Sequence, residues 1–499
     1  MEATNPRRWW ILIVLCLSSL VLMVDGMALT VAVPRMTQDI GATAADIQWI
    51  LDSYVLVFAG LLLTSGSLGD RFGRRRVMLI GLLLFGTASL AATFATTPGE
   101  VISIRIAMGV GGALIMPSTL SILITVFDAD ERRKAMAAWT SVSMLGLVGS
   151  PVFAGLLLDH FSWHSIFFVN VPVVALAIAA GLVLMPESRG PWQRPDPLGA
   201  LLSAAGMTAL VWWIIGIPQH GFVRGTSAIS LTIAVMALAG FVIWEHITPA
   251  PMVPLGLFRH RNFSGGSISL ALVEIGNGGL LLLLTQYLQF VLGYPPVKAG
   301  LAFVPLAVGA LIGNTAGVRA GPKLGNRYLV LGGMLVMSAS FWLLTTVSAS
   351  TGFAVPAAGL GLLGLGAGLA MPAAVSALMA TIPPEQAGVG SALNDTIGQA
   401  GSALGVAILG SLLASGFARH MPASAPAQAR QSIGGALAIA HGDSALIRAA
   451  RDAFTSSMSA TFAVSAVGVL AAAILAALIM RDTRPAAAPA AAEETSLAG

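Results

Sequence analysis

Charged side chains are scarce in this sequence. Only 10% of the 499 residues are Asp, Glu, Lys or Arg, whereas 56% are apolar, and the mean hydropathy is +0.85. An average soluble domain carries about 25% charged residues, so this composition excludes a soluble protein. Cysteine is almost absent as well. The single Cys16 excludes an intrachain disulfide and carries no information about the redox compartment.

Motifs for phosphate binding, metal binding and covalent catalysis are also missing. No Gly-rich loop ends in Lys followed by Ser or Thr, so an ATP-driven pump is not expected. The seven histidines lack metal-ligand spacing, and neither a Gly-x-Ser-x-Gly motif nor a cysteine pair occurs. We therefore expect no enzymatic activity, no metal and no cofactor.

Long apolar runs are what the sequence has in abundance. A membrane-spanning helix needs about 20 mainly apolar residues. Fourteen such runs lie between polar breaks, at about 9–31, 47–67, 77–95, 101–127, 135–158, 165–185, 197–217, 226–245, 264–291, 299–319, 328–347, 352–380, 388–414 and 456–480. The first run contains Asp25 and lacks a cleavage site, so we interpret it as a retained span. The sequence predicts an all-α integral membrane protein.

The loops between these runs differ in charge. Cytoplasmic loops of membrane proteins carry an excess of Lys and Arg. With the N-terminus inside, the inner loops carry 18 of these residues and the outer loops carry 7. The cations occur singly or in short clusters, a pattern that fits lipid contact and not a nucleic-acid-binding face. We therefore expect a multi-pass protein of the cell (plasma or inner) membrane with both termini in the cytoplasm.

Two basic turns indicate an internal repeat. One loop reads GSLGDRFGRRR and another reads GVRAGPKLGNR, and their glycines Gly73 and Gly325 are 252 residues apart. The same offset relates Ile11, near the start of the first run, to Phe263, at the start of the ninth. Two packed halves around a central site are a recurring plan of secondary transporters.

The repeat predicts a division of the chain into segments. These are an N-terminal six-helix half at 1–185, an inserted helix pair with linkers at 186–263, a C-terminal six-helix half at 264–480 that includes a long outer loop at 417–455, and a disordered cytoplasmic tail at 481–499.

Charges inside the apolar runs are candidate functional groups, because a charge at mid-bilayer costs about 2.5–3.5 kcal/mol. Asp25 and Arg105 lie at similar predicted depth, so an ion pair between their helices is geometrically possible. Such a pair has two interpretations: it couples protons or substrate, or it only fixes helix packing.

Glu274 lies near the predicted midplane, with Asn277 one turn further on the same helix face. Its apolar surroundings disfavour the charged form, which suits a group that alternates between protonated and ionised states. The alternative is a neutral Glu hydrogen-bonded between helices. Asp395 is shallower and nearer the cytoplasm. For Asp52 and Glu245 we expect interfacial positions, with the charged ends reaching water.

Three motifs resemble those of the major facilitator superfamily. The loop GSLGDRFGRRR resembles the signature between its second and third spans, through Gly66, Gly69, Asp70, Arg71, Gly73 and Arg74. GLVGSPVFAG resembles the antiporter motif of span five, through Gly146, Gly149, Pro151 and Gly155. VDGMALTVAVP, which contains Asp25 and Pro34, resembles the first span of the fourteen-span drug:proton antiporter branch. The resemblance implies the major facilitator fold and a basic loop that acts as a conformational latch.

Two positions depart from the branch pattern. Ser150 replaces the usual Gly before Pro151, and Gly398 stands where relatives commonly have Arg. Without that Arg, Asp395 lacks a cation that relatives provide.

The resemblance implies a proton-coupled antiporter that exports amphipathic organic compounds, cations among them, by alternating access. Protons, the substrate and membrane lipids are its expected partners, the proton gradient is its energy source, and we expect it to work as a monomer. A dedicated exporter of one self-made metabolite, antibiotic or lipid-like molecule is the nearest alternative. A nutrient importer and a non-transporting receptor fit less well.

Overall fold

The computed structural model describes residues 7–127, 129–189, 196–222, 225–249, 251, 253, 255–382, 387–440 and 443–481. All regular secondary structure within these ranges is helical. The first eight helices are α1 (Arg8–Asp39), α2 (Ala44–Phe72), α3 (Arg74–Ala92), α4 (Pro98–Val126), α5 (Ala129–His160), α6 (Ser165–Leu184), α7 (Pro197–His220) and α8 (Thr226–Ile247).

From residue 255 onward, the described residues contain one 3-10 turn, one π-helical turn and eight α-helices. These elements are η1 (Leu255–Arg259), α9 (Arg261–Gln286), η2 (Tyr287–Val291), α10 (Pro296–Leu301), α11 (Val304–Leu324), α12 (Asn326–Leu344), α13 (Ala354–Met379), α14 (Ala387–His420), α15 (Ile433–Ile439) and α16 (Ser444–Ile479).

An apolar segment in lipid must satisfy its backbone hydrogen bonds internally, which favours a helix. Side-chain caps fix where several of these helices begin, and two of the caps are reciprocal. Thr43 accepts a hydrogen bond from the amide of Asp46 at the start of α2, and the Asp46 carboxylate accepts one from the Thr43 amide. Thr97 and Glu100 form the same reciprocal pair at the start of α4. Such capping boxes satisfy amide groups that a helix start leaves free.

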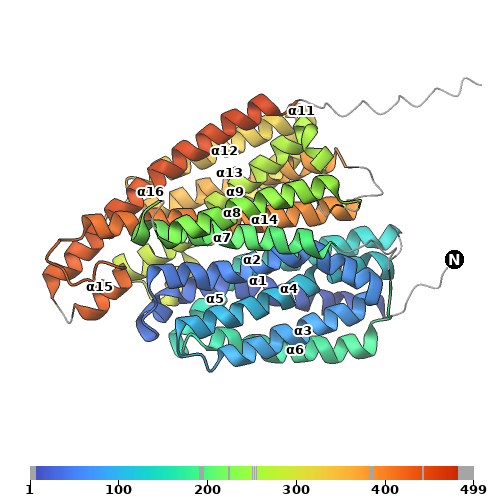
Figure 1. Ribbon diagram of the computed structural model, residues 1–499, viewed down its shortest axis with the longest axis horizontal. Coiled ribbons are helices and arrows are strands. Elements are labelled where there is room, and N and C mark those ends of the chain that lie inside the picture. Colours follow the sequence, from blue (N-terminus) through green and yellow to red (C-terminus); the bar gives the residue numbers. More distant parts are fainter. Residues whose placement is uncertain are drawn as a thin grey trace, which may run out of the picture.

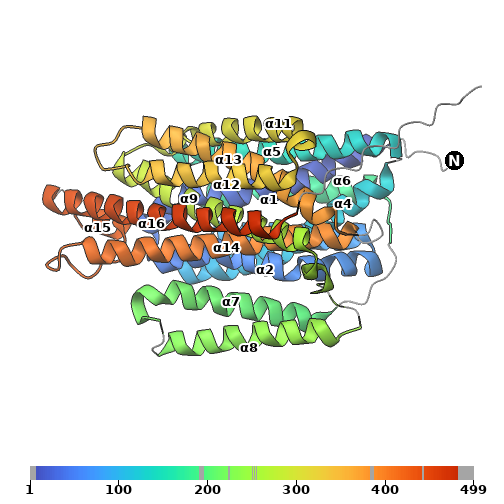
Figure 2. The ribbon, with the colours of Figure 1, turned by 90° about the horizontal axis from the view of Figure 1, so that it is seen from above.

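The long helices form two groups that lie side by side (Figures 1 and 2). The first helix group is α1–α6, and the second helix group is α9–α14 with α16. In the first group α1 packs on α5 and α6, and α4 packs on α2 and α3. The second group repeats these contacts, since α9 packs on α14 and α16, and α13 packs on α11 and α12.

The offset of 252 residues also relates the helix bounds of the two groups. Shifted by this offset, α2 spans 296–324, which is the start of α10 to the end of α11, and α3 spans 326–344, the bounds of α12. Gly73 and Gly325 are each the single residue between two long helices. Their φ angles of 108° and 81° lie in the region that favours glycine.

These two turns define the basic-turn end of the bundle, and the short helix α15 lies at the opposite end, here called the α15 end (Figure 2). Helix α1 begins and α16 ends at the basic-turn end (Figure 1).

Helices α7 and α8 pack on each other and lie beside the two groups (Figure 2). Helix α7 contacts α2 of the first group and α14 of the second. A Cβ at Gly60 of α2 would lie 2.8 Å from the Cβ of Ala204, so this glycine permits close approach of α7.

Thirteen helices in the described ranges are long and apolar enough to cross a membrane. Helix α5, which contains the predicted span 135–158, is not among the thirteen. The predicted outer loop at 417–455 is wrong in extent, because α14 continues to His420 and α16 already begins at Ser444. Residues 482–499 of the predicted tail lie outside the described residues.

Candidate transport site

Asp25 of α1 and Arg105 of α4 meet inside the first helix group. Arg105 Nη1 lies 2.5 Å from Asp25 Oδ2. The side chain of Asp25 is 0% exposed and that of Arg105 is 1% exposed. The ion pair that similar depth made possible is therefore present. Burial removes both groups from solvent, so each depends on the other for compensation of its charge.

Two further helices hold this pair. Asn170 of α6 donates to Asp25 Oδ1 at 3.2 Å, and Arg105 Nε donates to the carbonyl of Ile50 in α2 at 3.1 Å. The Arg105 guanidinium also lies 4.2 Å from the centre of the Tyr54 ring. Neither Asn170 nor Tyr54 was predicted as a partner, although an Asn inside the apolar run 165–185 is a signal of a buried polar contact.

Glu274 lies at the contact between α9 and α14. A Cβ at Gly401 would lie 3.0 Å from Glu274 Cβ, and one at Gly398 would lie 3.9 Å from Glu274 Cγ. Gly278 of α9 and Gly405 of α14 likewise approach backbone of the facing helix. The Glu274 side chain is half-buried, and it has no ion pair or hydrogen bond with any described residue.

Asp395 lies one turn before Gly398 on α14, so it belongs to the same side of that helix. Asn394 donates to Asp395 Oδ1 at 3.1 Å, and no described Lys or Arg pairs with it. Asn277, on α9, is half-buried. Gly398 lies next to Glu274. An Arg at position 398, as in the branch pattern, would therefore be near Glu274 as well as Asp395, and this chain has no cation there.

The carboxyl group of Asp52 does not reach water, contrary to our expectation. Its side chain in α2 is 0% exposed, and neither carboxyl oxygen has a hydrogen-bond partner among the described residues. Packing explains the error, because the residues one turn before and after Asp52 are covered: Gln48 lies against Gly410 of α14, and Leu56 packs with Val211 of α7 and Ala403 of α14. A buried carboxyl without a partner is costly, which makes Asp52 a functional candidate that sequence position alone did not reveal.

Glu245 is also buried, so its carboxyl group does not reach water as expected. It is 3% exposed at the end of α8, and its Oε2 accepts a hydrogen bond from the amide of Val253 at 2.8 Å. Its neighbour Trp244 donates to Asp196, which caps the start of α7. These contacts fix the ends of the α7–α8 pair and give Glu245 a structural role.

The basic turn after α2 is held by ion pairs. Asp70 Oδ1 lies 2.8 Å from Arg74 Nη2, and Arg74 Nη1 donates to the carbonyl of Ser121 in α4. Glu187, beyond α6, accepts from the Arg75 amide at 3.1 Å and lies 3.5 Å from Arg76 Nε. The turn thus joins α2, α3, α4 and the end of α6.

The glycines of this motif differ in how much space surrounds them. A Cβ at Gly73 would lie 2.6 Å from the Glu187 carboxyl group, and its φ already requires glycine. At Gly66 and Gly69 an added Cβ would make only ordinary contacts. Arg71 lies over the ring of Phe72, at the surface of the turn.

The antiporter-like motif of α5 contacts both helix groups. Gly146 faces α1, where an added Cβ would lie 2.8 Å from Leu20. Gly155 faces α10, where it would lie 2.5 Å from the Cα of Val297, and Gly300 of α10 faces the Pro151 carbonyl. Gly149, in contrast, is exposed with nothing nearby. The motif therefore allows close contact between α5 and α10.

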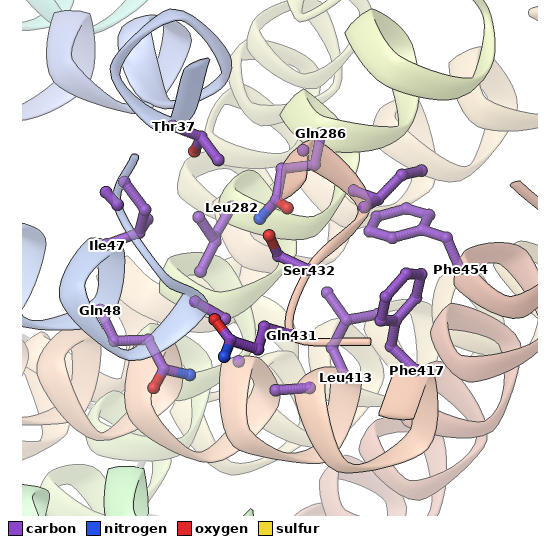
Figure 3. Close-up of a pocket in the computed structure, with 16 residues that line it drawn as sticks. Thr37, Ile47, Gln48, Leu282, Gln286, Leu413, Phe417, Gln431, Ser432 and Phe454 are labelled. Atoms are coloured by element: carbon purple, nitrogen blue, oxygen red, sulfur yellow. The ribbon is translucent and has the colours of Figure 1, made fainter. Parts of the chain in front are cut away.

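A cavity at the α15 end lies where the two groups meet, and we call it the amide cavity (Figure 3). Its walls carry the amides of Gln48, Gln286 and Gln431. Apolar side chains such as Leu282 and Phe417 complete it. Beside it, Gly434 of α15 packs against Thr37 of α1. The segment before α16 thus reaches from the second group to the first.

The comparison with known families agrees with this architecture. The model of the Major Facilitator Superfamily matches residues 15–406. The chain belongs to this superfamily. Its fold, with the basic turn between α2 and α3, is that of a multi-span helical transporter in a membrane.

Curated relatives of this superfamily member cover most of its length. It is 34% identical to the multidrug efflux pump LfrA of Mycolicibacterium smegmatis, over 96% of this chain and 97% of that protein. It is 34% identical to the tetracenomycin C resistance and export protein of Streptomyces glaucescens, over 82% and 76%. It is 33% identical to the methyl viologen resistance protein SmvA of Salmonella typhimurium, over 90% and 93%.

Solved structures resemble this superfamily member in fold. A bacterial homologue of the human lysosomal transporter Spinster, inward-facing and unoccupied, matches with a TM-score of 0.70 at 18% identity, over 96% of this chain and 98% of that one. The POT family transporter PepTSo matches with a TM-score of 0.63 at 15% identity, over 95% and 99%.

Proposed function

We propose that this protein is a proton-coupled antiporter that exports amphipathic organic compounds, cations among them, and that it belongs to the fourteen-span drug:proton antiporter branch. Relatives that are named for efflux of drugs or resistance to them support export. One feature of the charge distribution carries the proposal for proton coupling.

That feature is an excess of acidic groups among the described residues inside the bundle. Arg105 is matched by Asp25, whereas Asp52, Glu274 and Asp395 have no cationic partner among the described residues. An unmatched carboxyl group in a low-dielectric site is stable when it is protonated or when a cation lies beside it. Protons and a cationic substrate therefore compete for the same groups, which is the requirement for antiport.

The exchange follows from this competition. On the cytoplasmic side a cationic substrate displaces protons from the carboxyl groups. On the opposite side, incoming protons neutralise them and favour release. The membrane potential supplies about 2.3 kcal/mol per charge for each 100 mV, so one or two protons drive a useful gradient.

The proposed topology has fourteen spans. Helices α1–α6 form one half of six spans, the other half has the six spans α9, α10 with α11, α12, α13, α14 and α16, and α7–α8 is an inserted hairpin. The position of the start of α1 and the end of α16 at the same end supports an even number of crossings, and we propose α5 as the crossing beyond the thirteen (Figure 1). The excess of Lys and Arg supports a cytoplasmic position of the basic-turn end. We place the protein in the plasma membrane as a monomer among lipids, with the proton gradient as its energy source.

Transport in proteoliposomes tests the proposed function. Purified protein is reconstituted with tetraphenylphosphonium, an amphipathic cation, and a pH gradient is imposed. We expect gradient-driven transport by the wild type, and loss of proton coupling in Glu274→Gln and Asp52→Asn at equal reconstitution. A transport rate that does not depend on the pH gradient would contradict antiport. Wild-type coupling in a variant would show that the changed carboxyl group has no part in the mechanism.

Export of a single metabolite is the second candidate, because one relative is named for export of the antibiotic tetracenomycin C. A panel of chemically unrelated cations and neutral antibiotics separates the two candidates. Transport of several classes favours multidrug export, and transport of one class favours a dedicated exporter.

A further inference from the structure

Two adjoining cavities lead inward from the α15 end. Besides the amide cavity, of about 30 Å³, a second cavity of about 130 Å³ is lined by Thr43, Ala418 and Arg430, and we call it the Arg430 cavity. Gln48 and Gln431 line both. A water molecule needs about 10–15 Å³ of such volume and a few polar partners, so both cavities accommodate water.

Gln48 is the innermost polar group of this pair of cavities on α2. It is 3% exposed, and its Nε2 has no hydrogen-bond partner among the described residues. The amide lies against α14, where a Cβ at Gly410 would collide with Nε2. A buried donor without a partner is costly, and a water in the adjoining cavity relieves that cost.

Asp52 lies one turn after Gln48 on the same side of α2, about 6 Å along the helix axis. Both of its oxygens are likewise without partners among the described residues. One turn further, Leu56 packs with Val211 of α7 and Ala403 of α14 in an apolar cluster. Asp52 therefore has a polar neighbour towards the α15 end and an apolar barrier towards the basic-turn end.

We infer that protons reach Asp52 from the α15 end through the two cavities, and that the Gln48 amide positions the last water of this route. The inference rests on the proposed function, in which Asp52 takes up a proton. Gln48 is a positioning residue, since it orders the water without losing a proton itself.

Other titratable groups on α2 and the helices packed against it fall into two sets. Asp25 and Arg105 are occupied with each other. The remaining groups on these helices are Arg8, Arg35, Asp39, Asp46, Tyr54, Asp70, Arg71, Arg74, Arg75, Arg76, Glu100, His220, Asp395, Arg419 and His420.

Stopped-flow measurement of proton release tests the route. Detergent-purified protein is mixed with tetraphenylphosphonium in a weakly buffered solution that contains a pH-indicator dye. Gln48→Leu should slow the release by about tenfold, the order of effect of losing one hydrogen bond to a transferring group, while the number of protons released stays the same. Gln428→Leu, which removes an equal amide from an exposed position outside both cavities, should keep the wild-type rate.

A second variant tests the route at an exposed residue, where a substitution is not expected to impair folding. Gln431 is exposed and lies in both cavities, so Gln431→Trp narrows the route without a burial cost and should also slow release. Wild-type rates in Gln48→Leu and Gln431→Trp would overturn the route while leaving antiport intact. An equal slowing by Gln428→Leu would overturn the role of Gln48. Proton release that Asp52→Asn does not reduce would instead show that the proposed function fails at Asp52.

Discussion

Individual side chains inside the bundle are either matched or unmatched in charge, and the two kinds have different consequences when changed. The matched pair Asp25–Arg105 connects four helices through Asn170 and the Ile50 carbonyl. The unmatched groups Asp52 and Glu274 have no such partners among the described residues. Changes in the pair should therefore affect stability first, and changes in the unmatched groups should affect coupling first.

A double-mutant cycle tests the pair. Asp25→Asn and Arg105→Gln each leave one buried charge without compensation, so each should lower stability by about 3–5 kcal/mol. The double variant should lose less than the two single losses together. Thermal unfolding in detergent measures the three variants, and additive losses would show that the residues are not coupled.

Gly398 offers a test of Glu274. In Gly398→Arg the new cation lies on α14 beside Glu274, where an added Cβ would be 3.9 Å from its Cγ. The guanidinium competes with a cationic ligand, so binding of tetraphenylphosphonium should weaken by about tenfold, or about 1.4 kcal/mol. Gly398→Ala adds the Cβ without the charge and should bind as the wild type does. Equal weakening in both variants would attribute the effect to packing.

The position of a residue in the sequence predicted its depth along a helix but not its burial. The similar depth of Asp25 and Arg105 predicted that they could pair, because helix rise converts position into depth. Asp52 and Glu245 were misplaced, because depth does not say which neighbouring helix covers a residue. The cover of Asp52 comes from α7 and α14, which lie far from it in sequence. The apolar runs predicted the helices, and the two glycine turns predicted the repeat. The helical residues at both ends of 417–455 were missed because polar residues are frequent there.

At the scale of helices, α5 owes its contact with α10 to small residues. Gly155→Ala would direct a methyl group at the Val297 backbone, so α10 must move away. Overpacking of this kind costs about 1–3 kcal/mol and should shift the protein away from the conformation with α5 and α10 in contact. Cysteine-accessibility labelling at the α15 end measures the shift. Gly149→Ala, on the same helix with open space, is the control, and equal labelling of both variants would contradict the prediction.

The basic turn should act on conformation and not on ligand contact. Asp70→Asn removes the negative partner of Arg74, so we expect an altered balance between inward-open and outward-open states and a lower turnover. Affinity for tetraphenylphosphonium within one state should stay the same. State-specific labelling and binding measurements separate the effects. An unchanged balance with a large loss of affinity would place the turn in the binding site.

At the scale of the whole molecule, the α15 segment connects the two helix groups. A Cβ at Gly434 would lie 3.3 Å from Thr37 Cβ, close to the separation of about 3.8 Å in disulfides. The variant Thr37→Cys/Gly434→Cys, made in a Cys16→Ser background that has no other cysteine, should form this bond on oxidation. Oxidation should stop transport, reduction should restore it, and the single-cysteine variants should be insensitive. Full transport by the oxidised protein would show that α15 and α1 stay together throughout the cycle.

The position of α15 also has a pharmacological consequence. In the proposed topology this helix faces the medium outside the cell and rests on α1 of the other half. An antibody fragment or cyclic peptide that clamps α15 to α1 would arrest the cycle without crossing the membrane. Such an inhibitor would not enter the transport site, so the protein could not export it.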